Sequence, residues 1–365
     1  MGLKCGIVGL PNVGKSTLFN AISSGKAESA NFPFCTIEPN VGVITVPDER
    51  LGILESLVKP EKVVPTFIEF VDIAGLVKGA SKGEGLGNKF LANIREVDAI
   101  VHVVRCFDDD NVVHVDGRVN PVEDKQVIDI ELQLKDLESV DKRVQRVEKL
   151  AKTGDAASKK ELVILHKLKS HLESGKNARS LEDISDDESL LIRDLQLLTI
   201  KPIIYAANVD EASAASGNGY VEELKKEVIN EMAEVVVVCA SLEEQIAELD
   251  LEERGMFLDE YGLKQSGLDQ LITASYSLLN LITYFTAGKQ EVRAWTIKRG
   301  WKAPQAAGVI HTDFEKGFIR AEVIKLEDYQ RLGTELACKE AGKMGVEGKE
   351  YVVKDGDIMH FRFNV

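Results

Sequence analysis

A glycine-rich run around a lysine could bind phosphate groups. Residues 9–16 read Gly-Leu-Pro-Asn-Val-Gly-Lys-Ser and match the pattern G-x-x-x-x-G-K-[ST]. Backbone N–H groups of such a loop surround phosphates, and the helix that follows adds a favourable dipole. We expect Lys15 to reach the β- and γ-phosphates and the Ser16 hydroxyl to bind Mg²⁺. The expected nucleotide contacts in this loop are Asn12, Val13, Gly14, Lys15, Ser16 and Thr17.

Two further residues could complete a magnesium site. Asp72 begins the motif Asp-Ile-Ala-Gly after a hydrophobic run, and an aspartate at a strand end can hold Mg²⁺ through water. Thr36 lies between the phosphate loop and Asp72, where GTPases place a switch threonine. The predicted metal ligands are therefore Ser16, Thr36 and Asp72.

One position departs from the usual GTPase pattern at the place of the attacking water. Ras-like enzymes have a glutamine directly after Asp-x-x-Gly, and it orients that water. Here the residue is Leu76, which neither donates nor accepts a hydrogen bond. Either another group positions the water, or hydrolysis is slow or absent.

A second departure concerns the base. Guanine-binding proteins carry Asn-Lys-x-Asp after a late strand, but this chain has Asn208-Val209-Asp210-Glu211. Adenine lacks the 2-amino group that the final carboxylate would bind, whereas Asn208 can still donate to N7 and accept from the 6-amino group. The expected base contacts are Asn208, Val209 and Glu211. The pattern favours ATP over GTP, and a degenerate guanine site is the alternative.

The elements that must position these residues alternate between strands and helices. Such an order predicts an α/β fold with a mostly parallel, doubly wound sheet. The expected strands of this sheet are 4–8, 41–46, 67–71, 99–104, 203–207 and 235–238, and the expected helices are 16–24, 251–261 and 268–281.

Two segments differ from this alternating pattern. Residues 129–198 are charged, with apolar residues at steps of three and four. This spacing predicts an inserted helical hairpin of coiled-coil type, and two surface helices of the same domain are the alternative. The last part suggests a small mixed β domain with strands at 292–297, 308–311, 318–323, 351–353 and 358–363. The predicted domains are 1–128 with 199–280, 129–198, and 281–365.

The composition narrows the functional class. The net charge of −15 disfavours nonspecific binding to DNA or other nucleic acid. The segment 281–365 is more basic and could touch RNA, and aromatics alternate there with cations: Trp295, Lys298, Arg299, Trp301 and Lys302. Five cysteines without a C-x-x-C pair fit reduced thiols in the cytoplasm. Neither a membrane span nor a signal peptide is expected.

Several motifs together resemble the Obg-like ATPase family. They are the phosphate loop, Asn-Phe-Pro-Phe-Cys-Thr-Ile-Glu-Pro-Asn, Val-Asp-Ile-Ala-Gly-Leu, Asn-Lys-Phe-Leu-Ala-Asn-Ile-Arg and Gly-Val-Ile-His-Thr-Asp-Phe-Glu-Lys-Gly-Phe-Ile-Arg-Ala-Glu-Val. The resemblance covers essentially the whole chain. It implies a GTPase-like P-loop core, an inserted helical domain and a C-terminal TGS domain of β-grasp type.

The resemblance also implies an activity. Family members prefer ATP and associate with ribosomes, so the partners expected here are ATP and the ribosome, either its large subunit or the whole particle. RNA would bind in the cleft between the TGS and helical domains, and the chain would be a monomer. His114 matches the histidine proposed to replace the missing glutamine, so the expected catalytic residues are His114 and Lys15. Asn12 matches relatives that use K⁺.

Other functions stay open at this point. A GTP-specific translational GTPase would require the altered base motif to bind guanine. A regulator that binds ATP without hydrolysing it would fit Leu76 but not His114. A metabolic P-loop kinase is disfavoured, because the chain has the Asp-x-x-Gly pattern and no arginine-rich lid. Cys35 precedes Thr36 and could link oxidation to activity, although a small buried side chain is the simpler interpretation.

Overall fold

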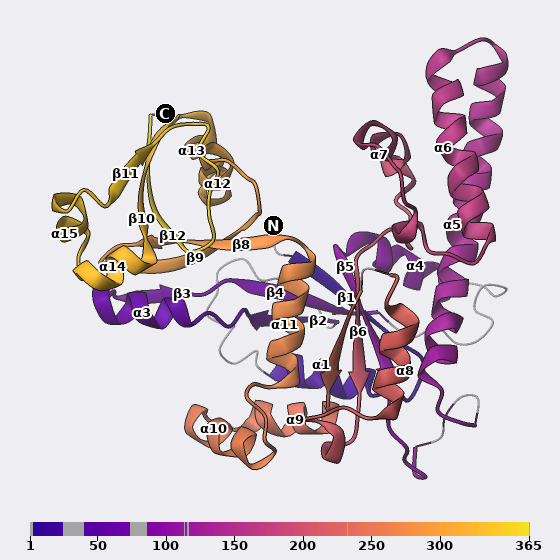
Figure 1. The fold of residues 1–365 in the computed structure, drawn as a ribbon, viewed down its shortest axis with the longest axis horizontal. Coiled ribbons are helices and arrows are strands. Elements are labelled where there is room, and N and C mark those ends of the chain that lie inside the picture. The colour runs from indigo at the N-terminus through magenta and orange to yellow at the C-terminus, as the bar shows by residue number, and fades with distance from the viewer. Residues whose placement is uncertain are drawn as a thin grey trace. The chain divides into compact units, whose positions relative to one another are not determined.

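The computed structural model describes residues 3–24, 40–73, 86–112, 114, 117–231 and 233–364. Thr36, Cys35 and Leu76 lie outside these described residues. Contacts divide the chain into two units, Met1–Ile44 with Glu69–Leu271, and Thr45–Ile68 with Ile272–Val365. Figure 1 shows the elements of both units.

The first unit is built on a six-stranded sheet in the order β2-β4-β1-β5-β6-β7. Its strands are β1 (Leu3–Val8), β2 (Val41–Thr45), β4 (Phe67–Asp72), β5 (Ala99–Arg105), β6 (Ile203–Asn208) and β7 (Glu234–Val238). The pairs β1–β5, β5–β6 and β6–β7 are parallel. Every residue of β5 and β6 is buried, as expected for central strands covered on both faces. The predicted α/β core is confirmed.

Figure 1 also shows the helices of the first unit. They are α1 (Lys15–Ser24), α4 (Leu86–Glu96), α8 (Gly219–Val228), α9 (Ala240–Glu248) and α10 (Leu251–Glu260). The next helix, α11 (Gly267–Leu278), begins in the first unit and ends in the second. The predicted helix at 268–281 ends early, because Leu281 already begins a strand. No helix among the described residues is long and apolar enough to span a bilayer.

A pair of long helices extends the first unit. α5 (Pro121–Lys152) packs along α6 (Ala156–Glu173), followed by the short α7 (Asp186–Ile192) (Figure 1). α5 begins eight residues before the predicted insertion at 129, because Asn120 accepts a hydrogen bond from the Glu123 N–H and Pro121 occupies the first turn. Cap and proline together are a strong start signal.

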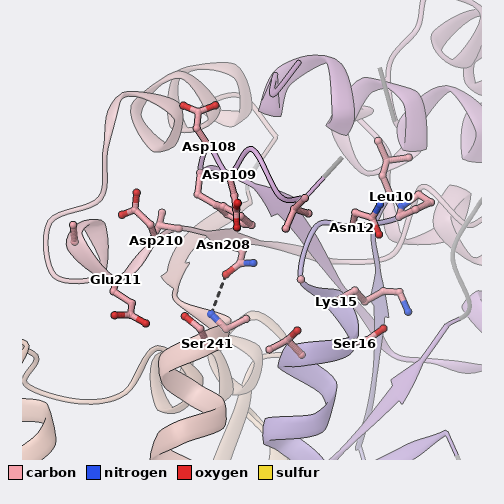
Figure 2. Close-up of a pocket in the computed structure, with 18 residues that line it drawn as sticks. Leu10, Asn12, Lys15, Ser16, Asp108, Asp109, Asn208, Asp210, Glu211 and Ser241 are labelled. Atoms are coloured by element: carbon pink, nitrogen blue, oxygen red, sulfur yellow. Dashed lines mark hydrogen bonds between the residues drawn. The ribbon is translucent and has the colours of Figure 1, made fainter. Parts of the chain in front are cut away.

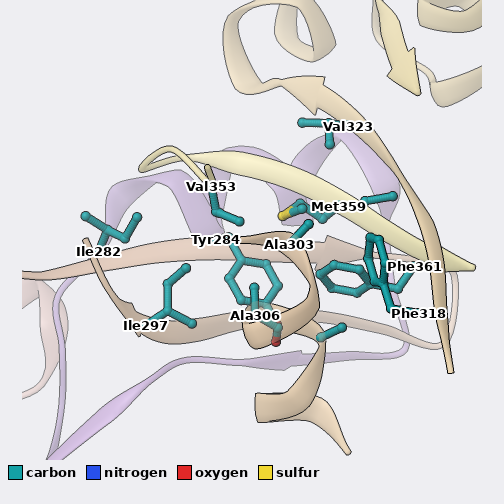
Figure 3. Packing of buried hydrophobic residues seen from close by; sticks show 12 residues of the cluster. Ile282, Tyr284, Ile297, Ala303, Ala306, Phe318, Val323, Val353, Met359 and Phe361 are labelled. Atoms are coloured by element: carbon teal, nitrogen blue, oxygen red, sulfur yellow. The ribbon is translucent and has the colours of Figure 1, made fainter. Parts of the chain in front are cut away.

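The second unit contains a six-stranded sheet in the order β11-β10-β12-β8-β9-β3. Its strands are β3 (Lys62–Val64), β8 (Leu281–Ala287), β9 (Glu291–Lys298), β10 (Phe318–Lys325), β11 (Met344–Glu347) and β12 (Asp357–Phe363). Its helices are α3 (Glu49–Val58), α12 (Ala303–Ile310), α13 (Thr312–Lys316), α14 (Leu326–Leu332) and α15 (Glu335–Glu340). Figure 3 shows Tyr284 within the buried cluster of this unit.

Two predicted strands of this unit were wrong. Residues 308–311 lie mainly in α12, which begins at Ala303 with Pro304 in its first turn. Residues 351–353 form only an isolated bridge, between Lys302 and Val352. Segments as short as Gly-Val-Ile-His and Tyr-Val-Val do not distinguish a buried helix from a strand, so the local sequence did not determine these two elements.

The second unit also includes residues that we assigned to the P-loop core. Residues 45–68 contribute α3 and β3 to it. β3 pairs in parallel with β9, and Leu51 and Leu54 of α3 join the buried cluster around Phe285. The predicted first domain, 1–128 with 199–280, therefore includes residues 45–68, which contact clustering assigns to the second unit.

A buried carboxyl group makes the stability of the first unit depend on pH. Glu243 in α9 is 3% exposed, and its carboxylate accepts a hydrogen bond of 2.7 Å from the Gly267 N–H. Burial raises the pKa of Glu243 from 4.5 to about 7. The unfolded chain therefore loses this proton at a lower pH than the folded chain does.

We predict that Glu243→Gln flattens this pH dependence. In the unmutated chain the free energy of unfolding should fall by roughly 2–3 kcal/mol as the pH rises from about 4.5 to about 7, whereas glutamine keeps an acceptor oxygen and does not titrate. Urea unfolding across this range measures the change. Glu244→Gln, at an exposed neighbour, is the control and should keep the slope. A slope that persists in Glu243→Gln would contradict the prediction.

Candidate active site: the phosphate loop and its cavity

The phosphate loop joins β1 to α1, as the motif predicted. Asn12 and Gly14 have φ of 64° and 90°, and such positive values favour glycine. A Cβ on Gly14 would lie 2.1 Å from Nδ2 of Asn208. Gly14 is therefore required by its backbone conformation and by the close approach of a neighbouring side chain.

Lys15 and Asp72 meet beyond the carboxyl ends of the inner strands β1 and β4. The Lys15 ammonium forms a short ion pair with the Asp72 carboxylate, and both side chains are only partly exposed. The Ile73 N–H donates to the Ile7 carbonyl at 3.1 Å, which brings the end of β4 beside β1. The structure thus brings together two site residues that are separated by 57 positions.

The oxygen donors near this ion pair fit a magnesium ion. Ser16 is exposed at the start of α1, and Asp72 ends β4. A hydroxyl and a carboxylate are oxygen ligands of the kind that Mg²⁺ prefers. Thr36, the third predicted ligand, lies outside the described residues.

Asn208 links the phosphate loop to the start of α9. Its Nδ2 donates to the Val13 carbonyl at 2.9 Å, and its Oδ1 accepts from the Ala240 N–H at 2.9 Å. The residue is 4% exposed. These two bonds leave one amide hydrogen for a ligand. Sequence reasoning gave Asn208 to the base and missed this bracing role.

The two residues expected beside Asn208 lie differently. Val209 is 3% exposed, and its N–H donates to the Val238 carbonyl at 2.9 Å. Glu211 is exposed at the start of a short 3-10 helix. Asp210 caps this helix by accepting from the Ser213 N–H at 2.9 Å, so its carboxylate has a structural task.

A cavity of about 1040 Å³ connects these residues. It is lined by Leu10, Pro11, Asn12, Gly14, Lys15, Ser16, Thr17, Phe107, Asp108, Asp109, Val112, Asn208, Val209, Asp210, Glu211, Ala212, Ala240 and Ser241. On the side away from Lys15 and Ser16, Figure 2 shows four acidic side chains: Asp108, Asp109, Asp210 and Glu211. The cavity therefore has a cationic and an acidic part, and its size suits a nucleotide.

Residues 107–112 and 240–241 were not predicted for this site. Both segments follow strands of the same parallel sheet, β5 and β7. Ligands of such sheets bind beyond the carboxyl ends of the strands. That rule, applied to the predicted strands at 99–104 and 235–238, could have found both segments.

His114 lies elsewhere in this conformation. Its Nε2 is 3.0 Å from an Asp124 carboxylate oxygen, and the two side chains are 5% and 4% exposed. His114 is not among the residues that line the cavity. Asp124 belongs to the first turn of α5, so the predicted catalytic histidine is held against this helix.

The aromatic residues expected to face RNA are partly buried. Trp295 and Trp301 both pack against the cluster around Tyr284. The Trp295 Nε1 donates to the Thr286 hydroxyl at 2.9 Å, and the Arg293 guanidinium lies 4.1 Å from a Trp295 ring centroid. The indoles serve the fold of the second unit, while the cations beside them, Lys298, Arg299 and Lys302, are exposed.

Comparison with known proteins places the chain in a family. A model described as 50S ribosome-binding GTPase matches residues 4–167, and the model YchF-GTPase_C, described as a protein of unknown function, matches residues 281–364. The chain is 61% identical to a protein of Bacillus subtilis (strain 168) over 367 residues, and the alignment covers all of both chains. The chain belongs to the YchF family.

Other relatives agree with this assignment. A Shigella flexneri protein is 58% identical over 365 residues and is likewise covered completely. Both it and the Bacillus subtilis protein are named ribosome-binding ATPase YchF. The structure of the Schizosaccharomyces pombe YchF GTPase is 42% identical with a TM-score of 0.90, covering 99% of this chain and 98% of that one. The resemblance inferred from the motifs is confirmed.

We predict that Gly14→Ala abolishes binding of a nonhydrolysable nucleoside triphosphate, because the added methyl group collides with Asn208. Gly154→Ala is the matched control, since Gly154 also has a positive φ, 97°, but no atom within 4 Å of a new Cβ. Both variants carry a backbone strain of about 1 kcal/mol. Calorimetric titration should find binding only in the control. Binding by Gly14→Ala within about threefold of the unmutated chain would contradict the prediction.

Proposed function

We propose that this chain binds and hydrolyses ATP in preference to GTP and works on the ribosome. The altered base motif carries the proposal. Guanine-binding proteins have a lysine where this chain has Val209, which is buried, and the last acid is Glu211. The Asn208 amide retains one hydrogen for N7 of either purine, so the preference for ATP rests on positions 209 and 211.

The names of relatives support the same activity. The Bacillus subtilis and Shigella flexneri proteins are called ribosome-binding ATPases. By analogy with these relatives, the proposed partner of this chain is the ribosome, either its large subunit or the whole particle. The proposal includes that the chain is cytoplasmic and acts as a monomer. RNA contact through the exposed cations of the second unit also belongs to it.

The residues of the cavity would share the work on the triphosphate. Lys15 and the loop N–H groups would hold the β- and γ-phosphates, and Ser16, Asp72 and Thr36 would hold Mg²⁺. When bound, Mg²⁺ neutralises charge that develops on the phosphate oxygens. Lys15 must then leave its ion pair with Asp72. Asn12, exposed in the loop, is the proposed contact for K⁺.

A second function rests on other names. The family model that matches residues 4–167 is described as a GTPase. The Schizosaccharomyces pombe structure is also described as a GTPase. In that case Glu211 would have to replace the usual aspartate on guanine. The third possibility is a regulator that binds ATP without hydrolysing it. Measurements of ATP turnover distinguish such a regulator from an ATPase.

We predict tighter binding of a nonhydrolysable ATP analogue than of its GTP counterpart. The expected ratio is about tenfold or more, because a guanine site loses strength when its acid and lysine are both altered. Calorimetric titrations with Mg²⁺, in K⁺ and in Na⁺, measure it. Sedimentation with 50S subunits and the ATP analogue tests the ribosomal part. GTP binding that is about tenfold tighter would overturn the ATP proposal, and equal results in K⁺ and Na⁺ would remove the K⁺ site.

We predict that His114→Ala lowers ATP turnover by roughly a hundredfold while leaving nucleotide affinity nearly unchanged, because a general base acts on the attacking water. To act in this way, His114 must leave Asp124. His166→Ala, at an exposed position of α6, is the control and should keep full turnover. An unaltered rate in His114→Ala would remove this histidine from the mechanism.

A further inference from the structure

Arg105 is a buried cation with an unusual environment. It ends β5, is 2% exposed and pairs in register with Asn208 of β6. In the described part of the chain, no carboxylate forms an ion pair with Arg105. A buried charge without a counter-charge is costly unless hydrogen bonds compensate it, so the partners of this guanidinium must matter.

Those partners are three backbone carbonyls of one short segment. Nε donates to Phe107 at 3.0 Å, Nη1 to Val112 at 2.8 Å and Nη2 to Asp109 at 3.2 Å. The guanidinium also lies 4.6 Å from the Phe107 ring centroid. Phe107, Asp109 and Val112 all line the nucleotide cavity, whereas Arg105 does not. The Arg105 side chain thus binds three residues that line one wall of the cavity, although it does not itself line the cavity.

Other contacts reach this segment less completely. The Tyr220 hydroxyl donates to the Asp108 carboxylate at 3.0 Å, but that bond is exposed. Nδ2 of Asn218 donates to the Cys106 carbonyl at 2.7 Å, which lies before the segment. Among the described contacts, only Arg105 binds both ends of residues 107–112.

We propose that Arg105 is a positioning residue for nucleotide binding. Its guanidinium fixes residues 107–112, of which Asp108 and Asp109 are seen in Figure 2 on the side of the cavity away from Lys15 and Ser16. This inference rests on the proposed function, since it takes the cavity to be the nucleotide site. Arg105 itself does not touch the ligand; it acts through the wall that it holds.

The chemistry explains why an arginine is needed. A guanidinium presents five N–H donors in a rigid planar fork, whereas a lysine ammonium is a single point charge. Arg105→Lys keeps the charge and nearly the size. A single ammonium, however, cannot reach the three carbonyls that bind the Nε, Nη1 and Nη2 atoms of the guanidinium. The variant should therefore fold and still lose the fixed wall.

The test combines affinity with local hydrogen exchange. In Arg105→Lys we expect the dissociation constant of a nonhydrolysable ATP analogue with Mg²⁺ to rise about fivefold or more. Amide exchange of residues 107–112 should become faster, while exchange in β6 stays unchanged. The matched control is Arg143→Lys. Arg143 donates to Glu161 at 2.6 Å between α5 and α6, outside the cavity lining, and its variant should match the unmutated chain.

Three other outcomes overturn the proposal. Affinity of Arg105→Lys within about twofold of the unmutated chain shows that the wall needs no arginine. Weaker affinity without faster exchange in 107–112 shows that Arg105 acts by another route. Faster exchange throughout β5 and β6 assigns it a general structural role. If the unmutated chain prefers GTP, the ATP proposal fails, and the same comparison with the GTP analogue still decides the role of Arg105.

Discussion

The cavity beside the phosphate loop depends on the amide of Asn208. This side chain joins the Val13 carbonyl of the phosphate loop to the Ala240 N–H of α9, and it does so at the end of a fully buried strand. The amide can approach the loop only because Gly14 has no Cβ. Without this bond, the glycines would leave the loop free to adopt many conformations. Two hydrogen bonds of one buried side chain therefore tie the phosphate loop to the start of α9.

Charge is distributed unevenly around this fixed frame. Lys15 faces Asp72 on the phosphate side, and the acidic side chains gather on the opposite side (Figure 2). A bound triphosphate with a divalent ion would give Lys15 and Asp72 new partners of opposite charge. Until then, each of the two groups is the other's partner of opposite charge. Arg105 adds a buried positive charge behind the acidic side, where Phe107 and Val112 form the wall.

Errors in the sequence-based reading have identifiable physical causes. Short apolar runs such as 308–311 satisfy helix and strand patterns equally well, and the proline-containing start of α12 decided for the helix. Residues 45–68 looked like part of the P-loop core because they lie between two of its strands. Their placement depends instead on the pairing of β3 with β9, which joins segments more than 200 positions apart. The catalytic role of His114 is not one of these errors: it was assigned by resemblance, the structure holds the side chain against Asp124, and the role stays a prediction.

The sequence by itself determined the phosphate loop, the acid at the end of β4, the altered base motif and the α/β order of the core. These features are local: glycine spacing sets backbone conformation, and hydrophobic periodicity sets the type of element. Only the tertiary structure decided which strand ends converge and what they bring with them. The bracing by Asn208, the wall at 107–112 and its support by Arg105 arise from hydrogen bonds between backbone and side chains whose partners local sequence does not specify. Such contacts are set by sheet order and register, so they became visible only once the strands were in place.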